Sequence, residues 1–102
     1  MTETTPSLRI DIWLWRARFF KTRSHAASAS ESGQLRLERF NKISRIEKSS
    51  TAIKPGDRLI FPLGAKLIDI MIEDIGERRG PPSEARTLYK EAFDAPDNKP
   101  NA

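Results

Sequence analysis

Cysteine is absent from this chain of 102 residues, and histidine occurs once, at His25. The lack of cysteine excludes a disulfide framework and a thiolate metal site, and it is typical of a reducing compartment. A single imidazole cannot supply the several nitrogen or sulfur ligands that a zinc site needs. Neither G-x-x-x-x-G-K-[ST] nor G-x-G-x-x-G occurs, so the sequence contains no glycine-rich phosphate-binding loop.

Long apolar runs are also missing, and none of the existing runs is long enough to span a bilayer. The first eight residues, MTETTPSL, contain neither the basic segment nor the apolar segment of a secretory signal. We therefore predict a cytoplasmic protein.

The residues that catalysis usually requires are sparse. A Ser–His–Asp arrangement would have to use His25, and no pattern places an acid and a nucleophile beside it. Asp69, Glu73 and Asp74 form a small carboxylate group on or just after an expected strand, where a solvated face is more common than a metal site. We predict a protein that is not an enzyme and has no metal, cofactor or small-molecule substrate.

Acidic residues are scarce in the first half, and this makes the charge distribution uneven. Residues 9–48 contain ten Lys/Arg and four Asp/Glu, whereas residues 49–102 contain eight Lys/Arg and nine Asp/Glu. A basic stretch can simply be a solvated helix face, but here the cations alternate with Trp and Phe. This pattern favours a nucleic-acid partner over the solvated face.

Residues 9–33 predict two short helices joined at residues 21–22. Asp11 is a plausible N-cap of the first helix, and Thr22 of the second, with Gly33 as the residue that ends it. In the first helix the apolar positions at helical spacing are Ile10, Trp13, Leu14, Ala17 and Phe20. In the second helix one face carries the small residues Ala26, Ala29, Ser30 and Gly33, which allow close packing.

The rest of the chain reads mainly as strands. Residues 34–39 alternate apolar and polar side chains, which predicts a half-buried strand. Residues 40–42 suit a hairpin tip, and residues 43–47 would form the antiparallel return strand. A turn at residues 54–57 precedes a strand at residues 58–61 that is expected to stop at Pro62. The clearest strand covers residues 66–75, with Ile68, Ile70 and Ile72 on one face.

A last helix is expected after residues 76–82, capped by Ser83, because one face would carry Ala85, Leu88, Tyr89 and Ala92. Residues 1–8 and 94–102 are polar and contain proline, so we expect them to be disordered, leaving one domain at residues 9–93. The order of elements predicts an α+β fold, in which two N-terminal helices pack on a mostly antiparallel sheet of about four strands, followed by a C-terminal helix.

The two expected helices at residues 9–33, here called the helical unit, contain the candidate contacts to nucleic acid. Its cations are Arg9, Arg16, Arg18, Lys21 and Arg23. Exposed N–H groups at the start of the second helix also favour phosphate. His25 lies in this first turn and is either a surface histidine or an RNA contact. Trp13 belongs to the core, whereas Trp15 is either a second packing surface, which we favour, or a platform for base stacking.

The string RIDIWLWRARFFKTR at residues 9–23 resembles the opening of the ribosome-associated heat shock protein 15 family. Residues 33–37, 48–50, 54–57 and 76–89 continue the resemblance. That family carries the alpha-L RNA-binding motif, also named the S-four domain after small-subunit ribosomal protein four. The chain departs from the family pattern at Ile12, Ala27 and Glu38 and in a small insertion expected at residues 39–45, and it lacks the long basic C-terminal extension of some members.

The resemblance implies an RNA surface made by the helical pair and the adjoining strand, with Arg9, Lys21, Thr22, Arg23 and Ser24 in it and Arg36 and Lys48 at its edge. It also implies a ribosome-associated stress protein that binds ribosomal RNA of the large subunit. We further predict a monomer. Two other interpretations remain open on the residues. One is a DNA-binding helix-turn-helix protein, and the other is a protein–protein adaptor that uses the C-terminal helix.

Overall fold

The computed structural model describes residues 6–92, which form one sheet of five strands, a smaller pair of strands and three α-helices. The helices are α1 (Ile10–Arg16), α2 (Arg23–Glu31) and α3 (Pro82–Ala85), which continues as a 3₁₀ turn, Arg86–Leu88. The strands are β1 (Leu8–Arg9), β2 (Arg36–Arg39), β3 (Lys42–Arg45), β4 (Ala52–Ile53), β5 (Arg58–Leu63), β6 (Lys66–Ile72) and β7 (Tyr89–Glu91).

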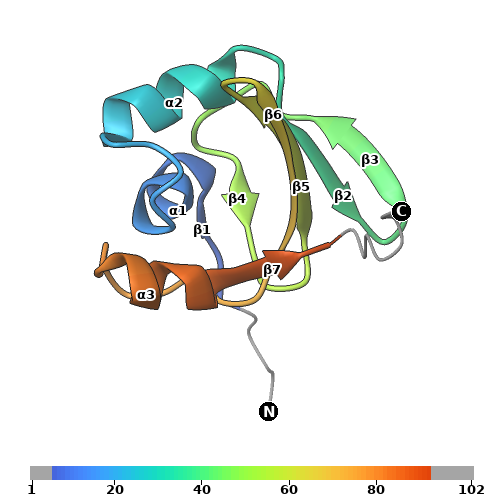
Figure 1. The fold of residues 1–102 in the computed structure, drawn as a ribbon. Helices are drawn as coiled ribbons and strands as arrows, with labels where there is room; N and C mark the ends of the chain where they lie inside the picture. Colours follow the sequence, from blue (N-terminus) through green and yellow to red (C-terminus); the bar gives the residue numbers. More distant parts are fainter. Residues whose placement is uncertain (1–5, 93–102) are drawn as a thin grey trace, which may run out of the picture.

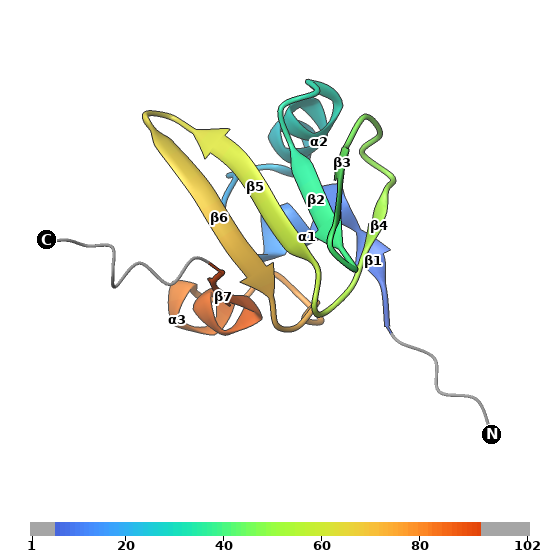
Figure 2. The same ribbon diagram turned by 90° about the vertical axis from the view of Figure 1, so that its right-hand side faces the viewer.

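The larger sheet has the order β3-β2-β5-β6-β7, and every neighbouring pair in it is antiparallel. Strand β1 pairs separately with β4, so Leu8 lies opposite Ile53. All three helices lie on one side of the large sheet (Figure 1), and Figure 2 shows the sheet from its open side. The predicted α+β class, with two N-terminal helices on a mostly antiparallel sheet, is confirmed.

The core lies between α1 and the covered face of the sheet. Leu37 of β2, Leu59 and Phe61 of β5, and Ile70 and Ile72 of β6 all point into it, as the two-residue period of a strand requires. From the helices come Ile10, Trp13, Leu14, Ala17 and Ala26. The predicted apolar face of β6 is therefore confirmed.

Several local predictions are confirmed by the backbone. The Thr22 hydroxyl accepts a hydrogen bond from the His25 N–H at 3.0 Å and so caps α2. Gly33, with φ of +84°, follows that helix in the left-handed conformation that glycine adopts at low cost. The β2–β3 hairpin turns at Phe40 and Asn41, which have φ of +55° and +63°.

Asp11 is not the N-cap of α1, because that position belongs to Arg9. The Asp11 carboxylate instead lies in the first turn, where it accepts hydrogen bonds from the Ile12 N–H and from the Arg9 guanidinium. The helix is also shorter than its apolar pattern suggests: it ends at Arg16, and Arg18 has a φ of +67°. Phe20 reaches the edge of the core from the segment that follows.

The predicted last helix is wrong in its second half. Only residues 82–85 are α-helical, Pro81 rather than Ser83 is the N-cap, and Tyr89 is extended at φ −153° and ψ 167°. The residues from Tyr89 pair with β6, which would otherwise leave its backbone groups without a partner on that edge. Pairing in the sheet thus overrides a side-chain pattern that has helical spacing.

Strand β5 continues through Pro62, where a stop was predicted. The pairing of β5 with β2 reaches no further along β5 than Ile60. Pro62 therefore has no partner on β2, and its missing N–H removes no hydrogen bond to that strand. The short β1–β4 pair was not predicted, and it begins at Leu8, within the N-terminal segment expected to lack structure. The expectation for residues 94–102 lies outside the described residues.

Candidate nucleic-acid interface

Helices α1 and α2 pack closely because α2 presents small side chains to its neighbours. Ala26 and Ser30 are fully buried, and the Ser30 hydroxyl donates to the Ala26 carbonyl at 2.8 Å, so burial leaves no polar atom of this side chain unpaired. The other faces of α2 stay open to solvent. This packing holds the start of α2 rigidly beside the segment that leads into it.

The start of α2 is exposed and carries no acidic residue in its first turn. Lys21, Thr22, Arg23, Ser24 and His25 are all exposed there. The side chains of Lys21 and Arg23 make no hydrogen bond or ion pair with any other residue in the range 6–92. Free cations therefore stand beside a helix N-terminus, whose unpaired N–H groups and dipole also attract an anion.

The arginines of α1 and the residues after it have a different environment. Arg16 donates to the carbonyls of Gly76 at 2.7 Å and Ile75 at 3.4 Å, and Arg18 donates to the carbonyl of Gly80 at 2.6 Å. These bonds attach the helical unit to the loop between β6 and α3. Arg16 and Arg18 were predicted RNA contacts. Arg16 is partly buried and bonds to backbone carbonyls through Nη1, whereas Arg18 is exposed and bonds through Nε alone.

An arginine of the same loop also bonds to the helical unit. Arg79 donates to the carbonyls of Trp15 at 3.0 Å and Phe20 at 3.4 Å, and its guanidinium lies 5.7 Å from the centre of the Trp15 ring. This arrangement is a cation–π contact. Trp15 is therefore a packing residue, as favoured above, although its partner is the loop before α3. The spacing of residues in the sequence contains no signal for this contact.

Arg9 is a predicted contact whose charge is largely compensated. Its guanidinium forms two hydrogen bonds to the Asp11 carboxylate, at 3.1 and 2.9 Å, and Asp11 is 4% exposed. The Arg9 side chain is half exposed, so it can reach solvent but brings no net charge with it. Its main effect is to keep a buried carboxylate paired.

Arg36 and Lys48 lie beside the far end of α2. Arg36 donates to the Gly33 carbonyl at 2.9 Å, and Lys48 is exposed in the loop after β3. That loop is held against α2 by the Ser49 hydroxyl, which donates to Glu31 at 2.9 Å. Arg45 was missed: it lies opposite Arg36 in the hairpin, a register that follows from the predicted tip.

The remaining sheet arginines are held in ion pairs. Arg39 forms two hydrogen bonds to the buried Asp57 carboxylate, at 2.8 and 2.6 Å, and this bonding raises the pKa of Arg39. Arg58 bridges Asp69 and Glu38, chiefly through hydrogen bonds to Asp69, and the pKa of Arg58 is raised. Asp69 is thus part of an ion pair, and no group of metal-ligating side chains is found among residues 6–92.

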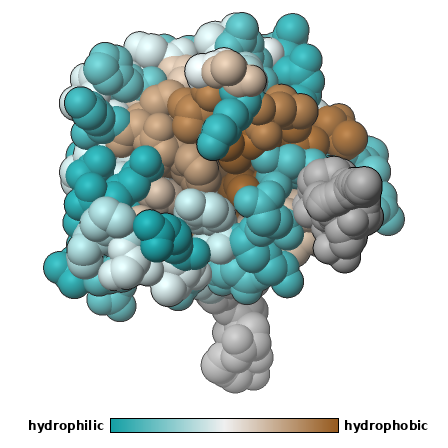
Figure 3. Space-filling view, in the orientation of Figure 1, coloured by the Kyte–Doolittle hydropathy of each residue, from teal (hydrophilic) through white to brown (hydrophobic). Residues whose placement is uncertain are grey.

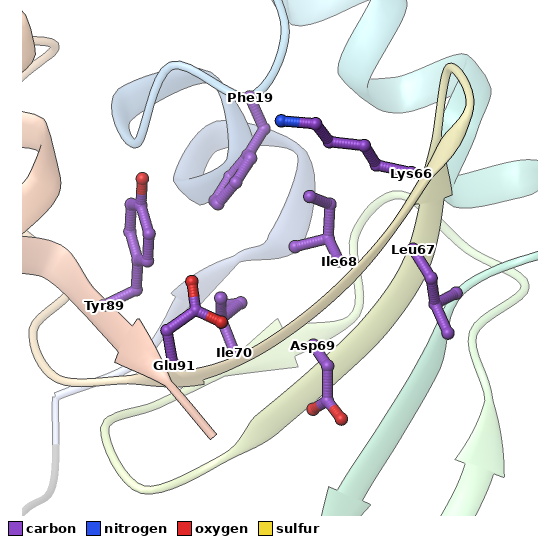
Figure 4. Close-up of a pocket in the computed structure, with 8 residues that line it drawn as sticks. All are labelled: Phe19, Lys66, Leu67, Ile68, Asp69, Ile70, Tyr89 and Glu91. Atoms are coloured by element: carbon purple, nitrogen blue, oxygen red, sulfur yellow. The ribbon is translucent and has the colours of Figure 1, made fainter. Parts of the chain in front are cut away.

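A groove of about 220 Å³ lies between β6, β7 and the segment that follows α1. Phe19, Ile68 and Tyr89 line it together with five further residues (Figure 4), and the Phe19 and Tyr89 ring centres are 4.8 Å apart. Figure 3 shows the hydrophobic area on this side, below α2. The free cations at the start of α2 do not line the groove.

None of the described helices could cross a membrane.

Comparison with known proteins begins with a negative result, since no protein-family model matches the chain. A solved structure of Vibrio cholerae heat shock protein 15, described as trimeric, superposes with a TM-score of 0.74 at 33% identity, over 85% of this chain and 83% of that one. The chain belongs to the heat shock protein 15 family. This finding confirms the family resemblance of residues 9–89 on a structural basis.

Two curated relatives extend the comparison. Heat shock protein 15 of Escherichia coli K12 is 32% identical over 88 residues, which make up 86% of this chain and 62% of that protein. The chain therefore spans less than two thirds of the length of that relative. The RQC P-site tRNA stabilizing factor of Halalkalibacterium halodurans is 29% identical over 92 residues, covering 90% of this chain and 98% of that protein.

Proposed function

We propose that this protein binds RNA through the start of α2, with Lys21, Thr22, Arg23, Ser24 and His25 in contact with the phosphate backbone. The observation that carries the proposal is the pair of exposed cations, Lys21 and Arg23, beside a helix N-terminus without an acidic first turn. Arg36 and Lys48 extend the surface along α2. Arg9, Arg16 and Arg18 lie close to it in sequence, and their side chains bond to the protein itself.

The RNA that we propose is ribosomal, on the large subunit, and the setting is cytoplasmic stress or ribosome recycling. Membership of the heat shock protein 15 family supports this setting. The Halalkalibacterium relative, whose name refers to P-site tRNA, aligns over 98% of its length and supports a ribosomal partner. The proposal is for a binding protein without enzymatic activity. Crosslinking in cells, followed by sequencing of the bound RNA, should enrich large-subunit ribosomal RNA, and recovery of unrelated RNA would reject this target.

The two rival functions predict different partners. A helix-turn-helix protein would read DNA with the exposed face of α2, which carries Arg23 and His25 as well as Ser24, Ser28 and Glu31, so competition between RNA and DNA decides this rival. An adaptor that uses a C-terminal helix would need an apolar helical face, and α3 has four residues and is followed by β7. The short α3 therefore disfavours the adaptor.

The test of the proposal is a binding titration at several salt concentrations. Affinity for a structured RNA should fall steeply with salt, with a slope near −0.7 for each phosphate contacted on a single strand. In competition, RNA should displace the protein from duplex DNA of equal length. A slope near zero would reject the phosphate-binding surface, and equal or tighter DNA binding would favour the helix-turn-helix interpretation.

The expected monomer stays a prediction, and the Vibrio relative described as trimeric makes it worth measuring. Strand β6 is paired with β7 only from Ile70 to Ile72, and Leu67, beyond that pairing, is 69% exposed. Light scattering on the protein at micromolar concentration should give the mass of one chain. A mass of two or three chains would reject the monomer, and Leu67→Lys would then test whether this edge is the contact.

A further inference from the structure

The tip of the β2–β3 hairpin carries the most exposed large apolar side chain in the described part of the molecule. Phe40 is 87% exposed and has a φ of +55°, and Asn41 follows with a φ of +63°. Two successive residues with positive φ form the type of hairpin turn that favours asparagine, aspartate or glycine. Asn41 suits this turn, whereas a bulky side chain at the position of Phe40 is unfavourable.

Stability of the fold does not account for Phe40. Its ring is open to solvent, so it gains little from burial, and its backbone adopts a conformation that asparagine would adopt at lower cost. An unfavourable backbone conformation together with an exposed apolar side chain points to a function outside the fold itself.

The charges around the tip point to a polyanion. On β3 the residues are Lys42, Ile43, Ser44 and Arg45, all exposed, without a carboxylate. The carboxylates closest in sequence are already paired, Glu38 with Arg58 and Glu47 with Arg45. Arg45 lies opposite Arg36 at the end of the hairpin near α2 and is paired with Glu47, so Lys42 is the cation of β3 without a partner among the described residues.

A hollow of about 270 Å³ adjoins the tip on the open side of the sheet. Phe40 and Asn41 line it together with Gly56, Met71, Ala92 and the ion pair of Glu38 with Arg58. The hairpin spans about 13 Å from Arg36 to its tip, at 3.3 Å for each residue. Figure 1 shows it at the side of the molecule away from α1 and α3. An aromatic face, an amide and space beside them suit a planar, hydrogen-bonding ring.

We propose that Phe40 stacks on an unpaired nucleobase of the RNA whose backbone is held at α2, with the Asn41 amide positioned to bond the edge of that base. The inference rests on the proposed RNA binding and adds a contact that distinguishes unpaired from paired RNA, because a base inside a helix has no free face. A protein contact at the tip is the other use of an exposed phenyl ring, and the polar neighbours Asn41 and Lys42 favour the base.

The experiment compares two RNA probes of equal phosphate number, a stem-loop with a ten-nucleotide single-stranded extension and a blunt duplex. Phe40→Ala should bind the extended RNA between about fivefold and about a hundredfold more weakly, while its affinity for the duplex and its salt slope stay at wild-type values. Phe40→Trp should retain affinity, and its emission should fall on binding by more than that of the wild-type protein. Ile43→Thr is the matched control on the same hairpin, since Ile43 is 61% exposed and has no ring.

Phe40→Asn separates this role from a structural one. It should raise the melting temperature, because asparagine tolerates the left-handed backbone, and still lose affinity for the extended RNA as Phe40→Ala does. Wild-type affinity in Phe40→Ala, or an equal loss for both RNA probes, would overturn the stacking and leave a protein contact as the use of the tip. If the wild-type protein itself binds neither RNA in a salt-dependent way, the proposed function fails along with this inference.

Discussion

Arg16 and Arg18 differ from Lys21 and Arg23 in what surrounds their side chains, although the four cations are close in sequence. The first two donate hydrogen bonds to backbone carbonyls of the β6–α3 loop, and Arg79 from that loop donates back to the helical unit. Lys21 and Arg23 have no partner among the described residues. Equal charge in the sequence therefore serves two purposes, one in joining segments of the fold and one in facing solvent.

Charge alone therefore does not identify which of these cations is free to bind phosphate. An arginine whose donors are engaged by carbonyls must give up those bonds before it can bind phosphate, and the carbonyls would then lose their partners. An exposed lysine exchanges only water and counterions, so phosphate binding costs little. The two groups should separate when stability and RNA affinity are measured on the same variants.

Trp13→Ala should have the largest effect, and it should act on stability. Trp13 is fully buried, and its indole N–H donates to the Asp74 carbonyl at 2.8 Å, just before the loop that Arg16 holds. Truncating a buried Trp costs about 3–5 kcal/mol, a large share of the stability of a small domain. Urea denaturation checks this expectation, and a midpoint near the wild-type value would remove Trp13 from the core that supports the RNA surface.

Arg16→Ala should lower the free energy of unfolding by about 1–3 kcal/mol, because it removes charge-assisted bonds and leaves the Gly76 carbonyl without its donor. Its RNA salt slope should stay at the wild-type value. Arg16→Lys is the matched control, because it keeps the charge but cannot reproduce the guanidinium bonds. A variant with unchanged stability and a shallower slope would transfer Arg16 to the RNA-contact group.

Thr22→Ala should lower the free energy of unfolding by about 1 kcal/mol through loss of the α2 cap. Because the same change loosens the first turn that holds Arg23 and His25, RNA affinity should fall as well, while the salt slope keeps its value. Thr22→Ser retains the hydroxyl and should behave as wild type in both measurements. Equal losses in the serine variant would show that the cap is not the cause.

Lys21→Ala should have the smallest effect on stability, since an exposed cation without a partner contributes little. Its melting temperature should match that of the wild type, and its RNA salt slope should be shallower by about 0.7, the contribution of one phosphate. Lys21→Arg should restore the slope. Wild-type affinity and slope in Lys21→Ala would move the proposed surface to the neighbourhood of Arg36 and Lys48.

Much of the fold could be predicted because it depends on local signals. The Thr22 cap, the left-handed Gly33 and the alternation of Ile68, Ile70 and Ile72 each follow from a few neighbouring residues. The segment from Tyr89 could not be predicted, because its helical spacing is overridden by a strand edge distant in sequence. The two-residue strands β1 and β4 have no periodicity that a sequence could reveal.

The candidate site divides in the same way. The sequence predicts which residues are cations and that the helix junction is basic. It does not predict that the Arg16 guanidinium reaches a carbonyl sixty residues away, or that Arg79 covers Trp15. Such pairs depend on how the β6–α3 loop returns to α1, which only the tertiary structure determines.

The most direct test of the account measures the RNA salt slope of the double variant Lys21→Ala with Arg23→Ala. A control with the same loss of charge is Lys66→Ala with Arg86→Ala, which changes an exposed lysine and an exposed arginine that have no partner among the described residues. We predict that the slope for single-stranded RNA becomes shallower by about 1.4 in the first variant and stays at the wild-type value in the control. Equal slopes in the two double variants would contradict the claim that the start of α2 holds the RNA backbone.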